Sequence, residues 1–257
     1  MSSVGSVGSY GTSYSPYSTI ASGGALQSAA QDASGLAIEQ KTEAQTRGLD
    51  QGSENLAMGK SALNIEDSAL EGITDYLQSI RELAVQAQNG LLSDEDKGYI
   101  QQQINQYLDG INDLANGTTF NEINLLDGSS GDLTIAADAE GSTANVSTYD
   151  STVASLGLAG FDVTSGNFSI DDIDNALEIV TSSRANVGAE TNRIDYASSY
   201  NSKASLELNG YAMDKNEDRA INALQDLKKK QALDQYQMML QKKQQDDAEK
   251  RSQMFFA

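Results

Sequence analysis

The chain has 257 residues, a net charge of −20 at pH 7, and neither cysteine nor histidine. This acidity disfavours binding to nucleic acid and to anionic lipid. The missing residue types exclude disulfides, thiolate or imidazole metal sites, and catalytic triads with a histidine base. The single proline, Pro16, lies near the start, so the rest of the sequence can form long helices. We expect no nucleic-acid partner, and no run is long and apolar enough for a membrane span.

Residues 1–24 consist mainly of serine, glycine and tyrosine, and they contain no lysine or arginine. Too few apolar side chains are present to offset the loss of chain entropy on folding, so we predict a disordered segment. The segment also lacks the basic start and the continuous apolar run of a signal peptide. We therefore expect that export would proceed without a cleaved signal peptide.

The strongest periodic pattern of the chain follows residue 53, after a weaker helical pattern over residues 25–50. Apolar residues recur every seven positions, and a second line lies three or four residues away: Leu56, Leu63, Leu70 and Leu77, with Ile73 and Ile80. This spacing is typical of a helix packed along another helix. Asn89-Gly90 is a typical end for it.

A second helix is predicted from Ser93 to Asn116-Gly117. Ser93 can cap its first turn, and the acids at 94–96 favour the positive end of the helix dipole. Ile100, Ile104 and Ile111 continue the apolar spacing. Because the connection to the first helix is short, we expect the two helices to lie antiparallel.

Residues 129–168 are rich in glycine, serine, threonine and aspartate, which indicates turns and short strands. The strands are predicted at 132–136 and 166–170. A third helix is expected over 169–215, and its apolar seam includes Ile173, Leu177, Val187 and Ile194. A terminal amphipathic helix follows over 216–257, and its apolar end at 254–257 is expected to bury against a partner.

The clusters of charged residues could bind a ligand, or they could be solvated helix faces and helix caps. The basic residues of 228–251 are interleaved with acids, which favours a solvated helix face over a nucleic-acid tail. The acids at 94–96, 171–172 and 246–247 lack the alternating ligands and the glycine of a calcium loop, so helix capping and solvation are favoured. We predict no metal, no cofactor and no catalytic residues, and therefore a protein that is not an enzyme.

Several motifs in sequence order resemble those of the bacterial flagellin family. They are Asp32–Ile38 with Arg47–Gln51, Ile80–Ala87, Phe120-Asn121 with Leu125–Gly128, and Ser183–Ala189 with Asn192–Ile194. The resemblance covers roughly residues 21–128 and 170–240. No family metalloprotease insert is present, because that motif requires histidine.

The resemblance implies a mainly α-helical fold. It is a long antiparallel rod, a coiled-coil-like bundle of two N-terminal helices and one C-terminal helix, with a small β-containing side element. The expected divisions are a disordered segment (1–24), an N-terminal helical rod region (25–128), a short variable insert (129–168), a C-terminal rod helix (169–215) and a terminal helix (216–257). The seam residues named above for all three helices are assigned to subunit packing.

The resemblance also implies a function and partners. The protein is expected to be secreted as a structural subunit of the flagellar filament, assembling with itself or with other flagellin subunits. Residues 1–20 do not match the apolar helix with which flagellins usually begin. The alternative is therefore a non-polymerising, flagellin-like protein that binds flagellin, an export chaperone or a regulator through its C-terminal helix.

One further partner is implied, the Toll-like innate immune receptor that binds flagellins. Arg81, Glu82 and Leu83 match the receptor-binding patch of the family. Ser79 stands where many recognised flagellins have arginine, and Gln103 where a glutamate is frequent. Loss of two charges from an interface centre weakens binding, so we expect weak receptor binding.

Overall fold

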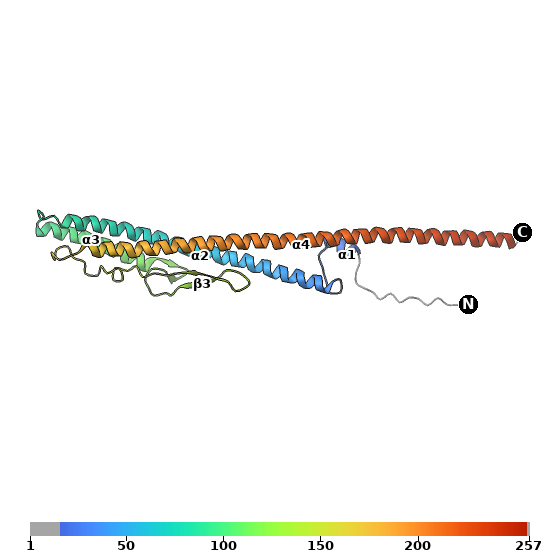
Figure 1. Cartoon of the computed structure of the whole chain (residues 1–257), viewed down its shortest axis with the longest axis horizontal. Coiled ribbons are helices and arrows are strands. Elements are labelled where there is room, and N and C mark those ends of the chain that lie inside the picture. Colours follow the sequence, from blue (N-terminus) through green and yellow to red (C-terminus); the bar gives the residue numbers. More distant parts are fainter. Residues whose placement is uncertain (1–15, 256–257) are drawn as a thin grey trace. The chain divides into compact units, whose positions relative to one another are not determined.

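The computed structural model describes residues 16–255 (Figure 1). Its elements are α1 (Pro16–Ala21), α2 (Ala33–Ala87), α3 (Asp94–Gly117), β1 (Thr119–Phe120), β2 (Ile123–Asn124), β3 (Leu133–Ala136), β4 (Thr143–Val146) and α4 (Ile170–Phe255). The expected fold class, mainly α-helical with a small β-containing element, is confirmed. The contacts divide the chain into two units, Arg47–Ala204 and the remainder, Met1–Thr46 with Ser205–Ala257. The helices α2 and α4 contribute residues to both.

Helix α2 is one uninterrupted helix, although the sequence shows a weaker helical pattern before residue 50 and a stronger one after residue 53. Its start is fixed by Asp32, whose Oδ1 accepts a hydrogen bond from the Gly35 backbone N–H at 2.9 Å. The helix ends at Ala87, where the Asn89-Gly90 pattern predicted an end. After it, the Asn89 side chain accepts from the Leu91 backbone N–H at 3.1 Å and closes the turn.

Helix α3 begins with the cap that its sequence predicted. Ser93 and Asp96 form a capping box, in which each side chain accepts from the backbone N–H of the other residue. The helix lies antiparallel to α2 (Figure 1). A methyl group added at Gly72 would lie 3.0 Å from Leu114, and one at Gly110 would lie 3.0 Å from the Tyr76 ring. These close approaches fix which turns of the two helices face each other.

Helix α4 begins at Ile170, next to Ser169, whose hydroxyl accepts from the Asp171 backbone N–H at 3.1 Å. Within the unit of residues 47–204 it runs antiparallel to α2. Four ion pairs join the two helices among the described residues of this unit: Arg81–Asp174 at 2.7 Å, Arg184–Asp67 at 3.0 Å, Arg184–Glu71 at 3.7 Å and Lys60–Asp195 at 2.6 Å. Exposed pairs of this kind add little stability, but they can hold one register of the two helices.

The core of this unit is the seam where α2, α3 and the start of α4 meet. Leu63, Leu70 and Leu77 of α2 are fully buried there, as are Ile104 of α3 and Ile173 of α4. The prediction of an apolar helix-packing seam is confirmed. No disulfide is possible in a chain without cysteine, so burial of these side chains supplies most of the stabilisation.

The side element consists of two antiparallel strand pairs, β1 with β2 and β3 with β4. In the second pair, Leu133 faces Val146 and Ala136 faces Thr143. This confirms the strand predicted at 132–136. The strand predicted at 166–170 is wrong, because the residues before Ile170 form turns and an irregular lead into α4. There Phe168 packs edge-on against Phe161, with ring centroids 5.9 Å apart.

The β3–β4 hairpin lies directly on the backbone of α2. A methyl group at Gly52 would lie 2.0 Å from the Ala137 carbonyl oxygen, and one at Gly48 would lie 2.0 Å from Ala139. Asn55 donates to the Ala136 carbonyl at 3.1 Å, and the buried Asn201 of α4 donates to the Ala137 carbonyl at 2.6 Å. The glycines of α2 therefore allow an approach that any side chain would block.

Two further expectations need correction. Residues 16–21 form helix α1, whereas the composition of 1–24 predicted disorder. Pro16 fits the first turn of a helix, and Gly24 lies so close to the Asn216 backbone that no side chain would fit there. Composition and periodicity carry no information about this tertiary contact. Residues 1–15 lie outside the described part of the chain.

The second correction concerns the C-terminal region. The two helices expected over 169–215 and 216–257 form a single helix, α4. Gly210, the helical glycine nearest this boundary, does not interrupt it, and no proline follows Pro16. The end expected to bury, at 254–257, falls on residues whose side chains lie outside the described structure. Among the described helices, none has a stretch apolar and long enough to cross a bilayer.

Leu77→Asp tests the seam. We expect the free energy of unfolding to fall by roughly 4 kcal/mol or more, because an unpaired carboxylate replaces a fully buried side chain. Denaturant unfolding followed by circular dichroism measures this. The neighbouring Gln78→Asp, at an exposed position, should change the free energy by less than about 0.5 kcal/mol. Unaltered unfolding of both Leu77→Asp and Ile104→Asp would contradict the seam.

Gly52→Ala tests the close approach of the hairpin. Alanine normally stabilises a helix by about 0.5–1 kcal/mol relative to glycine. At Gly52 we expect a loss of roughly 1 kcal/mol or more instead, because the methyl group would overlap the Ala137 carbonyl oxygen. Gly98→Ala in α3, where nothing lies within 4 Å of the added methyl, should show the ordinary gain. A gain at both positions would show that the hairpin yields freely.

Candidate subunit-packing surfaces

The seam residues assigned to subunit packing lie inside the chain. All but the partly buried Leu177 are buried: Leu56, Leu63, Leu70, Ile73, Leu77, Ile80, Ile100, Ile104, Ile111, Ile173, Val187 and Ile194. The seam is where the helices of one chain pack, so these side chains present no exposed surface to another copy. A surface for other subunits therefore has to come from other residues.

Large apolar side chains remain exposed along the C-terminal part of α4. Every residue from 228 to 251 is exposed. Within this stretch Leu233, Tyr236 and Leu240 are spaced so that they share one helix face. We call these three residues the terminal stripe. Leu233 and Tyr236 are about 60% exposed, which is unusual for large apolar side chains grouped on one face.

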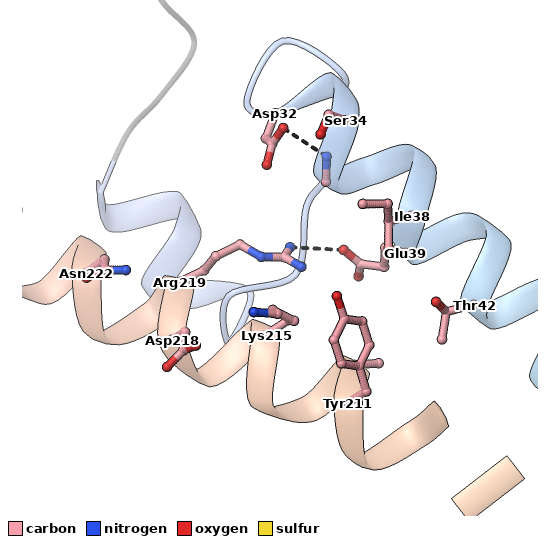
Figure 2. Close-up of a pocket in the computed structure, with 12 residues that line it drawn as sticks. Asp32, Ser34, Ile38, Glu39, Thr42, Tyr211, Lys215, Asp218, Arg219 and Asn222 are labelled. Carbon is pink, nitrogen blue, oxygen red and sulfur yellow. Dashed lines mark hydrogen bonds and ion pairs between the residues drawn. The ribbon is translucent and has the colours of Figure 1, made fainter. Parts of the chain in front are cut away.

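A second feature of the same unit is a cavity of about 380 Å³ between the start of α2 and the middle of α4 (Figure 2). Arg219 of α4 crosses its wall and pairs with Glu39 of α2 at 3.0 Å. The same guanidinium donates to the Gly24 carbonyl at 3.1 Å. Lys215 lies above the ring of Tyr211, with Nζ 5.6 Å from the ring centroid. The Arg219–Glu39 pair is largely shielded from solvent. Through its bond to Gly24, Arg219 also joins the segment after α1 to both helices.

The patch matched to the receptor-binding site lies on α2. Arg81 and Glu82 are exposed, and Leu83 is partly buried against the core. Arg81 donates from Nε to Asp174 of α4 at 2.7 Å, and this carboxylate raises the pKa of the Arg81 guanidinium. Ser79 donates its hydroxyl to the Asp75 carbonyl at 2.9 Å. The patch thus has one cation, and that cation is already paired within the chain.

Four aspartates serve as caps and turns. Hydrogen bonds from serine or threonine lower the pKa of the carboxyls of Asp96, Asp127, Asp138 and Asp162, through Ser93, Ser129, Ser142 and Thr164 respectively. Among the described residues, no group of three or more acids is arranged to hold a metal ion. These four carboxyls therefore act in local caps and turns.

One buried acid escaped the sequence analysis. Glu66 of α2 has no exposed surface, and neither of its carboxylate oxygens has a hydrogen-bond partner. A signal was present, since Glu66 stands seven residues before Ile73, and Ile80 continues this line at the same spacing. A glutamate on an apolar line of a packed helix is predicted to be buried.

Comparison with known proteins gives the same family at the level of sequence and of structure. The family model for the bacterial flagellin N-terminal helical region matches residues 15–131. The flagellar filament 30.7 kDa core protein of Treponema maltophilum is 35% identical over 198 residues, which are 69% of each chain. The flagellin of Listeria monocytogenes is 30% identical over 197 residues, again 69% of each chain.

A solved structure agrees with these relatives. The crystal structure of Bacillus cereus flagellin is similar with a TM-score of 0.52 and 27% sequence identity, over 58% of this chain and 88% of the other. The matched family region contains the capped helices α2 and α3 and their buried seam. The relatives named above are flagellins or flagellar filament core proteins. The chain therefore belongs to the bacterial flagellin family.

Proposed function

We propose that this flagellin is built into the flagellar filament through its terminal stripe, which packs against flagellin subunits of its own or of another kind. Members of the family are structural, non-enzymatic proteins that form filaments and are part of the flagellum. The observation that supports the proposal is the exposure of Leu233, Tyr236 and Leu240 on one face of α4. Exposure of such an apolar face to water is unfavourable, and packing of a second helix against the face would exclude the water.

The charge of this region agrees with packing between helices. Lys228, Lys229 and Lys230 precede the stripe, and small groups of basic and acidic residues follow it over residues 242–251. Lys229 already pairs with Asp226 at 3.7 Å. Mixed charges beside an apolar helix stripe are typical of helix–helix interfaces, where they fix the partner and its direction.

An export chaperone is part of the same proposal. A stripe that is covered only after assembly needs protection from aggregation beforehand. We assign this role to a chaperone that binds α4 over residues 228–251 before export. Export without cleavage of a signal peptide also belongs to the proposal.

Recognition by the innate immune receptor is proposed to be weak. Arg81 is the single cation of the matched patch, and Asp174 already holds it. Ser79 and Gln103 are neutral, and Gln103 donates to the Tyr107 hydroxyl at 3.2 Å. A receptor would have to compete for Arg81 without a further charge to compensate.

Assembly of the purified protein tests the proposed function. Electron microscopy should show filaments from the protein alone or mixed with an ordinary flagellin of the same cell. The double variant Leu233→Glu, Leu240→Glu should abolish incorporation, because it places two charges in the stripe. Its thermal unfolding should stay unchanged, since both residues are exposed.

Gln231→Glu with Gln235→Glu provides the matched control, since it adds the same charge to the same helix outside the stripe. This variant should assemble as the natural sequence does. Equal loss of assembly in both variants would mean that net charge, and not the stripe, decides incorporation. If the natural protein never enters a filament under any of these conditions, the non-polymerising alternative replaces the proposal.

A separate experiment tests how strongly the chain activates the receptor. In reporter cells, the natural chain should activate the receptor less than a flagellin that carries both charges, with a half-maximal concentration higher by roughly tenfold or more. Ser79→Arg with Gln103→Glu should recover part of that difference. Circular dichroism should confirm that the helices are unchanged. Full potency of the natural chain would refute the proposal of weak binding.

A further inference from the structure

Glu66 is an acid without a partner in the core of the unit formed by residues 47–204. Its side chain has no exposed surface, and neither Oε1 nor Oε2 accepts a hydrogen bond. It lies on the apolar seam of α2, between turns that contribute Leu63 and Leu70. An ionised carboxylate in such surroundings is strongly unfavourable unless it is paired.

The residues that follow β4 donate hydrogen bonds to two acids other than Glu66. Ser147, which follows β4, donates its backbone N–H and its hydroxyl to Glu190 of α4, at 3.0 and 2.6 Å. Thr148 donates its backbone N–H to Asp132 at 3.3 Å. These bonds join the hairpin to α4 and to the segment before β3, and Glu66 takes part in none of them.

The charges that face Glu66 come from each neighbouring element and have one sign. Glu190 lies on α4, Asp132 precedes β3, and Asp67 is the next residue of α2. Arg184, the cation that pairs with Asp67 at 3.0 Å, also pairs with Glu71 at 3.7 Å. Tyr149, after β4, is the remaining titratable group, and burial raises the pKa of its phenol.

We propose that Glu66 is a proton site that keeps the β3–β4 hairpin packed on α2 and α4 while the carboxyl is protonated, and loosens it when the proton leaves to solvent. As a neutral acid, the side chain is compatible with the apolar seam and with the three nearby carboxyl groups. As an anion, it would repel Glu190, which accepts the Ser147 hydrogen bonds, and Asp132, which accepts from Thr148. Repulsion would then act on the bonds that hold the hairpin.

The pH range of this effect follows from the protonation of the folded and unfolded states. Burial, followed by repulsion from Glu190, Asp132 and Asp67, raises the pKa of Glu66 from 4.5 to about 8. Between these values the folded chain binds one more proton than the unfolded chain. Stability is therefore greatest below about pH 4.5 with respect to this group, and it falls until the pH passes about 8.

Few other side chains interfere in this range. The chain has no histidine, the usual side chain that titrates between pH 5 and 8. The hydrogen-bonded carboxyls of Asp96, Asp127, Asp138 and Asp162 have lowered pKa values and titrate at more acidic pH. The phenol of Tyr149, whose pKa is raised from 10.0, titrates at more alkaline pH. A slope near neutral pH can therefore be attributed to Glu66.

The first experiment measures the unfolding equilibrium of the full chain as a monomer from pH 5.5 to 8.5. For the natural protein, the equilibrium constant for folding should fall by up to about tenfold per pH unit. Glu66→Gln, which resembles the neutral acid, should remove most of this slope. Glu54→Gln, an exposed change on the same helix, should keep it. Equal slopes in the natural protein and in Glu66→Gln would overturn the proposal.

The second experiment detects the proton directly and does not depend on a variant. Carbon NMR of labelled glutamate carboxyls in the natural protein should show one group that titrates near pH 8. Assignment of that signal to Glu66 supports the proposal. If Glu66 titrates near the ordinary value of 4.5, the proposal is wrong.

The third experiment tests the link to the hairpin. Amide hydrogen exchange at Ser147 and over Thr143–Val146 is compared between the natural protein and Glu66→Gln at each pH, which cancels the chemical pH dependence of exchange. The ratio of the two rates should rise at least about tenfold from pH 6 to pH 9 at these amides. It should stay near unity in the middle of α3. A uniform ratio across the chain would overturn the role in holding the hairpin.

Discussion

Burial of one apolar seam is the constraint on which the unit of residues 47–204 depends. Three helices meet along it, and the side chains that face inward, such as Leu70, Ile104 and Ile173, are fully buried. The ion pairs between α2 and α4 lie at the surface, where they add little stability but can hold the register of the two helices. The β1–β2 and β3–β4 pairs are too short to be stable alone, and they depend on the surface that the helices provide.

The same apolar helix pattern serves two purposes in this chain: packing between its own helices, and contact with other molecules. A heptad pattern states that a helix packs on another helix, but it does not state whether the partner belongs to the same chain. In α2 and α3 the partner is internal. In residues 228–251 no internal partner covers the helix, so the same kind of pattern is left for contacts with other molecules. Burial in the folded chain distinguishes the two cases.

The sequence predicted those parts of the fold that depend on local chemistry. The Ser93 cap, the end of α2 near Asn89-Gly90 and the strand near Leu133 arise from residues close together in the chain, and each was predictable. The features that the sequence did not predict depend on contacts between distant residues. Helix α1 is accompanied by the close fit of Gly24 on Asn216, and the burial of Glu66 depends on α4 and the hairpin. Period and propensity carry no information about such neighbours.

The way in which the hairpin rests on α2 has a consequence for the insert itself. Asn55 and Asn201 bind carbonyl oxygens of residues 136 and 137, and Gly52 meets the carbonyl of Ala137. Every amino acid has a carbonyl group, so these contacts place few demands on which side chains the insert carries. The supporting helices must remain as they are, and so must Ala139, which lies against Gly48, but the remaining turn residues 140–142 are an exchangeable part. A foreign epitope or a longer loop could be grafted there, and the same backbone contacts would display it.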